Sequence, residues 1–261
     1  IAVDPTNPDR MLIGWRQFDN ISSNFRQAGF GYTEDGGETW TFPGVIDPGQ
    51  FRSDPVLDVD SEGNFYYNSL THDANDDFVC DVFKIDAGGF EWDEGTFAQG
   101  GDKQWMVIDR SGGQGDGHIY SFWTQYWSYC YPGSFTRSVD GGASYEDCVG
   151  VDGYPYWGTL AVGPDGELYI AGAGGNQTLV VTKSTSALDP LFPVDWDFDV
   201  QVDLDGEMAG WSDVNPGGLM GQAYIDVDRS SGTGHGNVYV LASVERLSNG
   251  DPADVMFARS T

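Results

Sequence analysis

The sequence predicts an all-β protein in which one antiparallel unit is repeated along the chain, as in a β-propeller. Two observations lead to this prediction. A pattern of apolar strand, turn of Asp, Gly or Pro, and second strand returns five times, and no segment shows a helical period of apolar residues. Units of roughly 40–50 residues that each form a four-stranded sheet are typical of propeller blades.

The first repeat has the properties of an inner hairpin. Its copies share short runs of alternating apolar residues on both sides of a turn, which predicts two antiparallel strands. The equivalent turn residues are 49 to 65 residues apart. The five copies cover 1–15, 55–70, 105–123, 158–172 and 222–243, with Asp4, Asp60, Asp109, Gly163 and Asp228 as the equivalent turn residues.

A second pattern, Ser/Thr-x-Asp-x-Gly-x-Ser/Thr-aromatic, lies between the copies of the first. It is complete at 33–40 and 138–145, weaker at 84–92, and badly eroded at 183–192. One copy of each pattern predicts an inner and an outer hairpin, and thus one four-stranded blade. The complete copies contain Asp35, Gly37, Trp40, Asp140, Gly142 and Tyr145, and the weaker copy keeps Asp86, Gly88 and Trp92.

These repeats account for about four and a half blades. The chain opens at Ile1 inside a predicted strand and stops at 257–261, where a further copy of the second pattern is due. A propeller with a gap would expose unpaired strand edges. We therefore expect a single β-propeller domain over 1–261 that is truncated at both ends, with six blades, or seven, when complete.

The second pattern is an Asp box, and its alternation with inner hairpins resembles the sialidase-like, BNR-repeat superfamily of β-propellers. The resemblance covers essentially the whole chain. It implies that each box closes the turn between the third and fourth strands of a blade, where Asp accepts backbone N–H groups, Gly adopts a positive φ and the aromatic ring packs between sheets. By this resemblance the structural residues are Asp35, Gly37, Trp40, Asp86, Asp140, Gly142 and Tyr145.

The chain is strongly acidic. It has 41 Asp and Glu against 12 Lys and Arg, for a formal net charge of −29. This charge repels phosphate and so excludes nucleic acid as a partner, and no apolar run approaches the ~18 residues of a membrane span. The acidity is that of a solvated surface or, alternatively, supplies oxygen ligands for Ca²⁺. The calcium candidates are Asp73, Asp76 and Asp77 in 71–77, a run without the spacing of a known calcium loop; no cofactor is otherwise required.

The three cysteines cannot all pair within one chain. Cys130 and Cys148 flank a predicted hairpin and could be bridged across it, which would fit an oxidising compartment. The alternative is three buried thiols, and the residues alone do not separate the two.

Function is expected on the face opposite the boxes, which we call the loop face. On this face, the loop that leads into the first strand of each blade lies near the loop that joins the second and third strands of a blade. Loops on a rigid scaffold commonly carry function. The leading loops are 51–55, 100–105, 153–158 and 216–221. Cations and aromatic rings on one face of an acidic protein predict a site for sugars that bear carboxylate or sulfate. The alternative is that the arginines pair with neighbouring carboxylates and the rings pack. The substrate-binding candidates are Arg16, Arg26, Arg52, Asp54, Lys103, Trp105, Tyr126, Tyr156, Trp157 and Arg246.

Sialidase chemistry, as the resemblance implies it, requires three arginines, a Tyr nucleophile with a Glu, and an Asp acid/base. Arg16, Arg52 and Arg246 are an arginine triad by loop position only, because no Arg-Ile-Pro segment occurs and no Tyr–Glu pair can be identified. No catalytic residue is therefore assigned. We expect an extracellular or cell-surface propeller that binds or hydrolyses carbohydrate or a glycoconjugate. The alternative is a non-catalytic binding or structural propeller within a larger extracellular protein.

Overall fold

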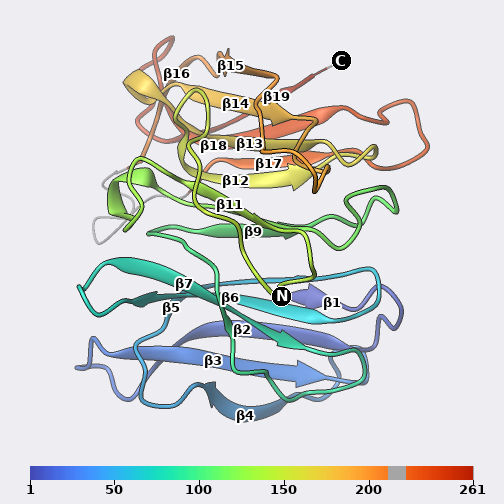
Figure 1. The fold of residues 1–261 in the computed structure, drawn as a ribbon. Coiled ribbons are helices and arrows are strands. Elements are labelled where there is room, and N and C mark those ends of the chain that lie inside the picture. The colour runs from blue at the N-terminus through green and yellow to red at the C-terminus, as the bar shows by residue number, and fades with distance from the viewer. Residues whose placement is uncertain (211–221, 261) are drawn as a thin grey trace.

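A computed structural model of the chain describes residues 1–210 and 222–260. In this part the regular elements are β-strands and two short 3-10 turns, and the strands form five antiparallel sheets. The sheets are stacked side by side in chain order (Figure 1). The chain is thus an all-β propeller structure, as the repeats predict. None of the described residues belongs to a helix that could cross a membrane.

The first two sheets each contain four strands that follow one another in chain order. Each strand pairs antiparallel with the next, and the first strand of a sheet contacts the first strand of the following sheet. The strands are β1 (Ala2–Val3), β2 (Met11–Phe18), β3 (Arg26–Thr33) and β4 (Thr41–Ile46), then β5 (Ser53–Val59), β6 (Phe65–His72), β7 (Phe78–Ile85) and β8 (Thr96–Phe97).

The fourth sheet repeats this plan, whereas the third and the fifth vary it. The third has three strands, and its outer edge is completed by an isolated bridge between Phe135 and Val149. In the fifth, two short strands share the same edge of one long strand. The elements are β9 (Trp105–Ile108), β10 (Ile119–Phe122) and β11 (Phe135–Ser138); β12 (Tyr156–Val162), β13 (Leu168–Ala173), β14 (Leu179–Ser184) and β15 (Phe198–Val202); β16 (Gly206–Met208), β17 (Tyr224–Val227), β18 (Val238–Arg246) and β19 (Asp254–Arg259); and the 3-10 turns η1 (Gln125–Trp127) and η2 (Gly175–Gln177).

Each copy of the first repeat forms the two inner strands of one sheet, so the predicted inner hairpins are confirmed. Asp60 shows why an Asp begins such a turn. Its carboxylate accepts the backbone N–H of Glu62 at 3.0 Å and of Asn64 at 2.9 Å, and it also accepts the Tyr66 hydroxyl at 3.1 Å. The side chain therefore satisfies turn N–H groups that would otherwise lack partners.

Buried side chains hold each sheet against the next. Between the first two sheets Leu12, Phe65 and Ile85 are fully buried in one apolar cluster. Arg10 is buried beside this cluster and donates to the Gly63 carbonyl at 2.7 Å, across the boundary between the two sheets. The scaffold that carries the loop face is consequently close-packed and rigid.

The Asp boxes at 33–40 and 138–145 share one hydrogen-bond geometry. Asp35 accepts the N–H and the hydroxyl of Thr39 at 2.9 and 2.6 Å, and the hydroxyl of Thr33 at 2.7 Å. Asp140 accepts the N–H and hydroxyl of Ser144 at 2.9 and 2.6 Å in the same way. The Thr39 and Thr33 hydrogen bonds hold the pKa of Asp35 at about 2. Both boxes lie on the side of the sheets opposite the loop face (right in Figure 1).

Glycine and aromatic residues complete the two boxes. Gly37 and Gly142 have φ of +93° and +89°, which L side chains rarely adopt. Tyr145 packs against the cluster between the second and third sheets, and Trp40 donates its ring N–H to the Gly37 carbonyl at 3.2 Å.

The weaker copy at 84–92 closes differently. The Asp86 side chain is 88% exposed and faces Lys84 at 3.4 Å instead of accepting turn hydrogen bonds. Trp92 nevertheless packs edge-on against Phe30 and Tyr67 in the core. Two box aspartates thus hold their turns, whereas the third copy keeps the aromatic contact and the positive φ of Gly88, at +79°, without the aspartate's hydrogen bonds.

We predict that Asp140→Ala lowers the free energy of unfolding by about 1–2 kcal/mol, because the turn loses three accepted hydrogen bonds. Denaturant unfolding measures this change. Asp86→Ala is the matched control, and we expect it to change stability by less than about 0.5 kcal/mol. An unchanged stability of Asp140→Ala together with lost ligand binding would contradict a structural role.

Candidate functional site

Two pockets open on the loop face and meet at η1. The first has a volume of about 490 Å³ and contains Arg16, Arg26 and Lys103; we call it the cation pocket. The second has a volume of about 670 Å³ and is lined by four tyrosines; we call it the tyrosine pocket. Trp127 of η1 lines the cation pocket, and the preceding residue Tyr126 lines the tyrosine pocket.

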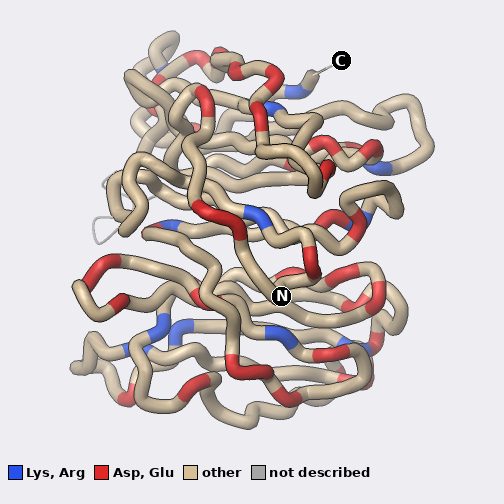
Figure 2. Tube along the Cα trace, viewed as in Figure 1, with Lys and Arg blue, Asp and Glu red and all other residues tan. Residues whose placement is uncertain are grey.

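The cation pocket lies above the first three sheets. Arg16 is at the end of β2, Arg26 begins β3, and Lys103 lies in the loop leading to β9. Figure 2 shows acidic segments spread over the whole molecule, whereas several cationic segments lie together at the left of the two N-terminal sheets. The fold thus concentrates scarce positive charge at one place on an acidic protein.

Two carboxylates partly neutralise this charge. Asp54 lies 3.5 Å from the Arg16 guanidinium and 3.6 Å from the Lys103 ammonium, and Asp102 lies 2.9 Å from the same ammonium. Three cations therefore face two carboxylates. The Arg16 side chain is 47% exposed and, among the described residues, has one long ion pair, so its guanidinium retains donors for a ligand.

Arg26 carries the remaining positive charge. Within residues 1–210 and 222–260 it forms no ion pair. Its guanidinium donates to Asn24 at 3.2 Å and to the Ser53 hydroxyl at 3.4 Å, and it stacks over the Phe51 ring at 5.3 Å. The side chain is half-buried, so a cation is held in position by neutral partners.

The backbone of the cation pocket is strained at two positions. Asp54 and Lys103 have φ of +43° and +60°, although neither is glycine. Such conformations cost of order 1–3 kcal/mol and are concentrated at functional sites. The β5–β6 ladder shifts register next to Asp54, and the Gln104 side-chain amide donates to the Asp54 carbonyl, which holds the conformation. This local structure turns both side chains toward the pocket.

Of the three arginines that could form a triad by loop position, Arg16 lines this pocket, whereas Arg52 and Arg246 do not. Arg52 is only 6% exposed, and its guanidinium pairs with Asp81 at 2.6 Å and Asp47 at 2.7 Å. Its role is to join the edges of the first two sheets. Arg246 lies on the fifth sheet, where Asp205 and Asp254 pair with it at 2.6 and 3.2 Å. The leading loop 216–221 lies outside the described residues.

Two predicted aromatic platforms also have other roles. Trp105 is partly buried against the apolar clusters of the third sheet, and its ring meets Tyr224 edge-on at 5.6 Å. Trp157 contacts Tyr156 edge-on at 4.9 Å and, with φ of +52°, lies beside the tyrosine pocket without lining it. Of the predicted aromatic residues, Tyr126 and Tyr156 do line it.

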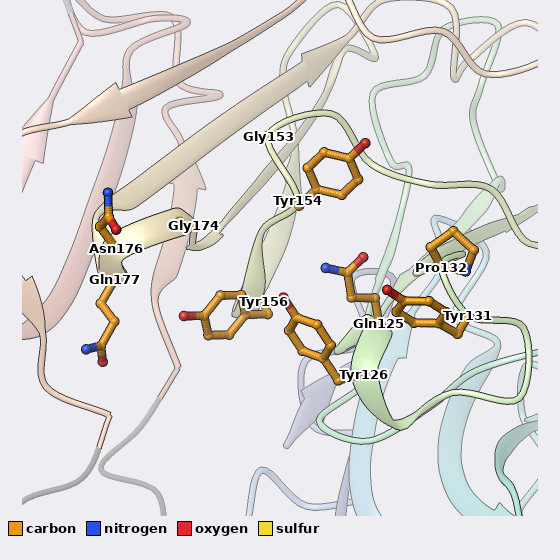
Figure 3. A pocket seen from close by; sticks show the side chains of 11 residues that line it. Gln125, Tyr126, Tyr131, Pro132, Gly153, Tyr154, Tyr156, Gly174, Asn176 and Gln177 are labelled. Carbon is orange, nitrogen blue, oxygen red and sulfur yellow. The ribbon is translucent and has the colours of Figure 1, made fainter.

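Figure 3 shows the tyrosine pocket from close by. Tyr126 and Tyr156 lie next to one another, with Tyr154 and Tyr131 on further sides and the amides of Asn176 and Gln177 opposite. The ring centroids of Tyr126 and Tyr156 are 6.0 Å apart. Burial and the neighbouring Tyr126 raise the pKa of Tyr156, and its hydroxyl, like that of any tyrosine, can donate a hydrogen bond at neutral pH.

A disulfide anchors the loop that carries Tyr131. Cys130 and Cys148 are bonded, which joins this loop to the outer edge of the third sheet. Cys80 is a buried thiol under Gly100, and burial raises its pKa. The sequence left the pairing open, because nothing in it located Cys80 in the core.

The calcium candidates do not converge. No group of three or more acidic, Cys or His side chains in the described part of the chain could hold a metal ion. The Asp73 carboxylate instead accepts the N–H of Asn75 at 2.8 Å and of Asp77 at 2.9 Å, which closes its own turn. Calcium binding at Asp73, Asp76 and Asp77 stays a prediction.

Sequence reasoning misses several lining residues in loops that belong to this face. They are Asn24, Ser53, Asp102, Gln125, Tyr131, Asn176 and Gln177. Most are neutral, so no charge or motif distinguishes them in the sequence. Their common signal is position within a loop of the loop face.

The comparisons with known proteins show the fold. No family model and no curated protein matches the chain. The Hadza microbial sialidase superposes with a TM-score of 0.60 at 12% identity, over 100% of this chain and 51% of that one. The leech intramolecular trans-sialidase gives 0.54 at 12% identity, over 91% and 36%. The GH74 xyloglucanase of Xanthomonas campestris gives 0.54 at 17% identity, over 100% and 38%. The chain thus spans about a third to a half of these glycoside hydrolase propellers, and the likeness defines a propeller fold without a particular family.

We predict that Cys130→Ser/Cys148→Ser lowers the free energy of unfolding by about 3 kcal/mol, because the bridge closes a loop between residues 18 apart. Denaturant unfolding with and without reductant measures the effect. Reductant should shift the wild-type midpoint toward that of the double variant and leave the variant unchanged. A wild-type midpoint insensitive to full reduction would contradict the prediction.

Proposed function

We propose that this propeller binds acidic carbohydrate in the cation pocket. The observation that carries the proposal is Arg26, a half-buried guanidinium that forms no ion pair with any described residue, beside Arg16 and Lys103 on a protein of net charge −29. A carboxylate or sulfate is the partner that these donors fit. Guanidinium groups bind such anions through two parallel hydrogen bonds that fix orientation as well as affinity.

The charge of the rest of the molecule narrows the ligand class. A polyanion such as nucleic acid would meet repulsion everywhere outside the pocket, whereas one anionic group on a mostly neutral ligand meets only the local cations. Sugars with one carboxylate or sulfate fit this pattern. The similar folds of sialidases and a xyloglucanase support carbohydrate as the ligand class.

We place this function outside the cell. A disulfide between Cys130 and Cys148 suits an oxidising compartment, and this is the observation that supports the location. That the chain is one part of a larger extracellular protein is part of the same proposal.

We predict that Arg16→Ala and Arg26→Ala each weaken binding of acidic sugars by roughly 10- to 100-fold, as expected for a lost charge-assisted hydrogen bond. A glycan array followed by calorimetry with N-acetylneuraminic acid and glucuronic acid measures this. Arg229→Ala is the matched control, since Arg229 is partly exposed, pairs with Asp226 at 3.5 Å and lies in the turn after β17. Equal affinity of the pocket variants and the wild type, or no binding of any acidic sugar, would contradict the proposal.

Hydrolysis of the bound glycan is the second candidate function, and one observation favours it. Asp54 and Asp102 both lie within ion-pair distance of the Lys103 ammonium, at 3.6 and 2.9 Å, inside the cation pocket. Two carboxylates flanking the glycosidic bond are the usual requirement of glycoside hydrolysis.

If hydrolysis occurs, we predict that Asp54→Asn reduces turnover of aryl glycosides of acidic sugars by at least about 100-fold, because a carboxylate acting as acid or base contributes 10²–10⁴-fold. Release of the aryl group measures turnover, and calorimetry shows whether sugar binding is retained. Asp226→Asn, remote from the pocket, is the control. Turnover that survives in both Asp54→Asn and Asp102→Asn would contradict this assignment, and an absence of turnover in the wild type would leave binding alone.

A further inference from the structure

We propose that the tyrosine pocket binds a neutral sugar unit, so that the ligand is an oligosaccharide with one acidic and one neutral part. This inference rests on the proposed function of the cation pocket and adds the chemistry of the second subsite. It is carried by the exposed rings, the uncharged lining and the shared wall at η1.

The tyrosine rings are exposed to a degree that packing does not explain. Tyr126, Tyr131 and Tyr154 are 58%, 64% and 64% exposed, although each ring carries a large apolar surface. Exposed apolar surface gathered around one pocket marks a binding site. A pyranose offers such rings a matching surface, because its axial C–H groups form an apolar face whose positive hydrogens suit the negative face of an aromatic ring.

The polar groups of the pocket fit hydroxyl groups. Among the described residues that line it there is no charged side chain, while Gln125, Asn176 and Gln177 contribute amides and the tyrosines contribute hydroxyls. Amides and hydroxyls donate and accept at once, as the hydroxyls of a neutral sugar also do. An anionic unit would find no cation among these lining residues. The Glu207 carboxylate accepts from the Gln177 amide at 3.4 Å but does not itself line the pocket.

The pocket is formed before a ligand arrives. Asn176 and Gln177 hold φ of +58° and +57°, which is strained for two consecutive residues other than glycine. Hydrogen bonds within the loop, from the Gly174 N–H to the Thr178 carbonyl at 2.8 Å and from the Thr178 hydroxyl to the Gly175 carbonyl at 3.1 Å, hold that conformation. A preformed pocket loses less entropy on binding.

A rigid wall joins the two pockets. Tyr126 and Trp127 are consecutive, so their Cα atoms are about 3.8 Å apart, yet they line different pockets. The N–H of Asp102 donates to the Trp127 carbonyl at 2.8 Å, and the N–H of Thr124 donates to the Asp102 carbonyl at 2.9 Å. The wall is thereby fixed to the segment that carries Lys103. Adjacent units of one short glycan can therefore occupy both pockets.

The test compares an acidic monosaccharide with oligosaccharides that contain it. The probes are N-acetylneuraminic acid with 3′-sialyllactose, and glucuronic acid with an aldotetraouronic acid; lactose and xylotriose are the neutral parts alone. Calorimetry on the intact chain is expected to show at least one oligosaccharide binding about tenfold more tightly than its acidic unit. Each contact between the sugar and a tyrosine ring contributes part of the binding free energy that this tenfold difference requires.

The variants assign that advantage to the tyrosine pocket. Tyr126→Ala/Tyr154→Ala should abolish the tenfold advantage and leave the affinity for the acidic monosaccharide unchanged. Tyr154→Ala alone, a ring without a stacked aromatic partner in the described structure, should remove part of it with an unchanged melting temperature. Phe192→Ala, which removes a ring that is equally exposed but lies outside both pockets, should keep the full advantage.

The outcomes separate the two proposals. If neither oligosaccharide binds more tightly than its acidic unit, or if the advantage persists in the double tyrosine variant, the neutral subsite is overturned and the cation pocket still stands. Lactose or xylotriose binding that requires the tyrosines, without binding of either acid, overturns the cation pocket and supports the neutral subsite. Saturation of the pocket by tetramethylammonium in place of sugar overturns the neutral subsite, because the rings would then serve a cation.

Discussion

Arginines fix the first four sheets of this propeller to one another, and two of them, Arg10 and Arg137, are removed from solvent. Arg10 reaches from the first sheet to the Gly89 carbonyl of the second at 2.6 Å. Arg137, 1% exposed, extends from the third sheet to the carbonyls of Ala187 and Phe192 in the loop between β14 and β15 of the fourth, at 2.8 and 2.6 Å. Arg110 links the third sheet back to Asp58 of the second at 2.6 Å. A buried charge is costly unless it is fully hydrogen-bonded, so these contacts require the sheets to keep one relative placement.

Because the sheets keep one relative placement, a small number of cations can both join the sheets and supply positive charge to the cation pocket. Arg10, Arg137 and Arg52 direct guanidinium groups to carbonyls and carboxylates, and their burial keeps them from a ligand. On the loop face, Arg16 and Arg26 are under-compensated by the described residues. A pocket with spare positive charge on a protein of net charge −29 is therefore a local exception that the rigid sheets keep in place.

The sequence predicts those features that depend on neighbours along the chain. Inner hairpins and complete boxes are recognisable because Asp, Gly and Thr act within a few residues, as the shared bonding of Asp35 and Asp140 shows. Features that depend on residues distant in the chain are not predictable in this way. Arg52 and Arg26 both belong to segments predicted on the loop face, and the carboxylates of Asp81 and Asp47, which pair with Arg52, are what distinguish it from Arg26.

The tyrosine pocket illustrates the same limit. Tyr126 and Tyr156 were predicted from their loops, but the pocket that they share exists because a bridge between Gly101 and Ser128 places η1 over the third sheet. Trp105 differs from them because its partner Tyr224 is on another sheet and covers it. Such contacts between residues of different sheets cannot be predicted from composition and spacing, because they depend on how the sheets pack.

The position of Cys80 has a consequence for how the chain acquires its covalent structure. Three cysteines allow three different single bridges, and a mispaired bridge to Cys80 would have to draw a β7 residue out of the core. Because Cys80 is fully buried and its thiol pKa is raised, the thiolate that would attack a disulfide is scarcely formed in the folded state. Oxidative folding therefore has a single durable product, and the folded protein should tolerate thiol-alkylating reagents and disulfide shuffling alike.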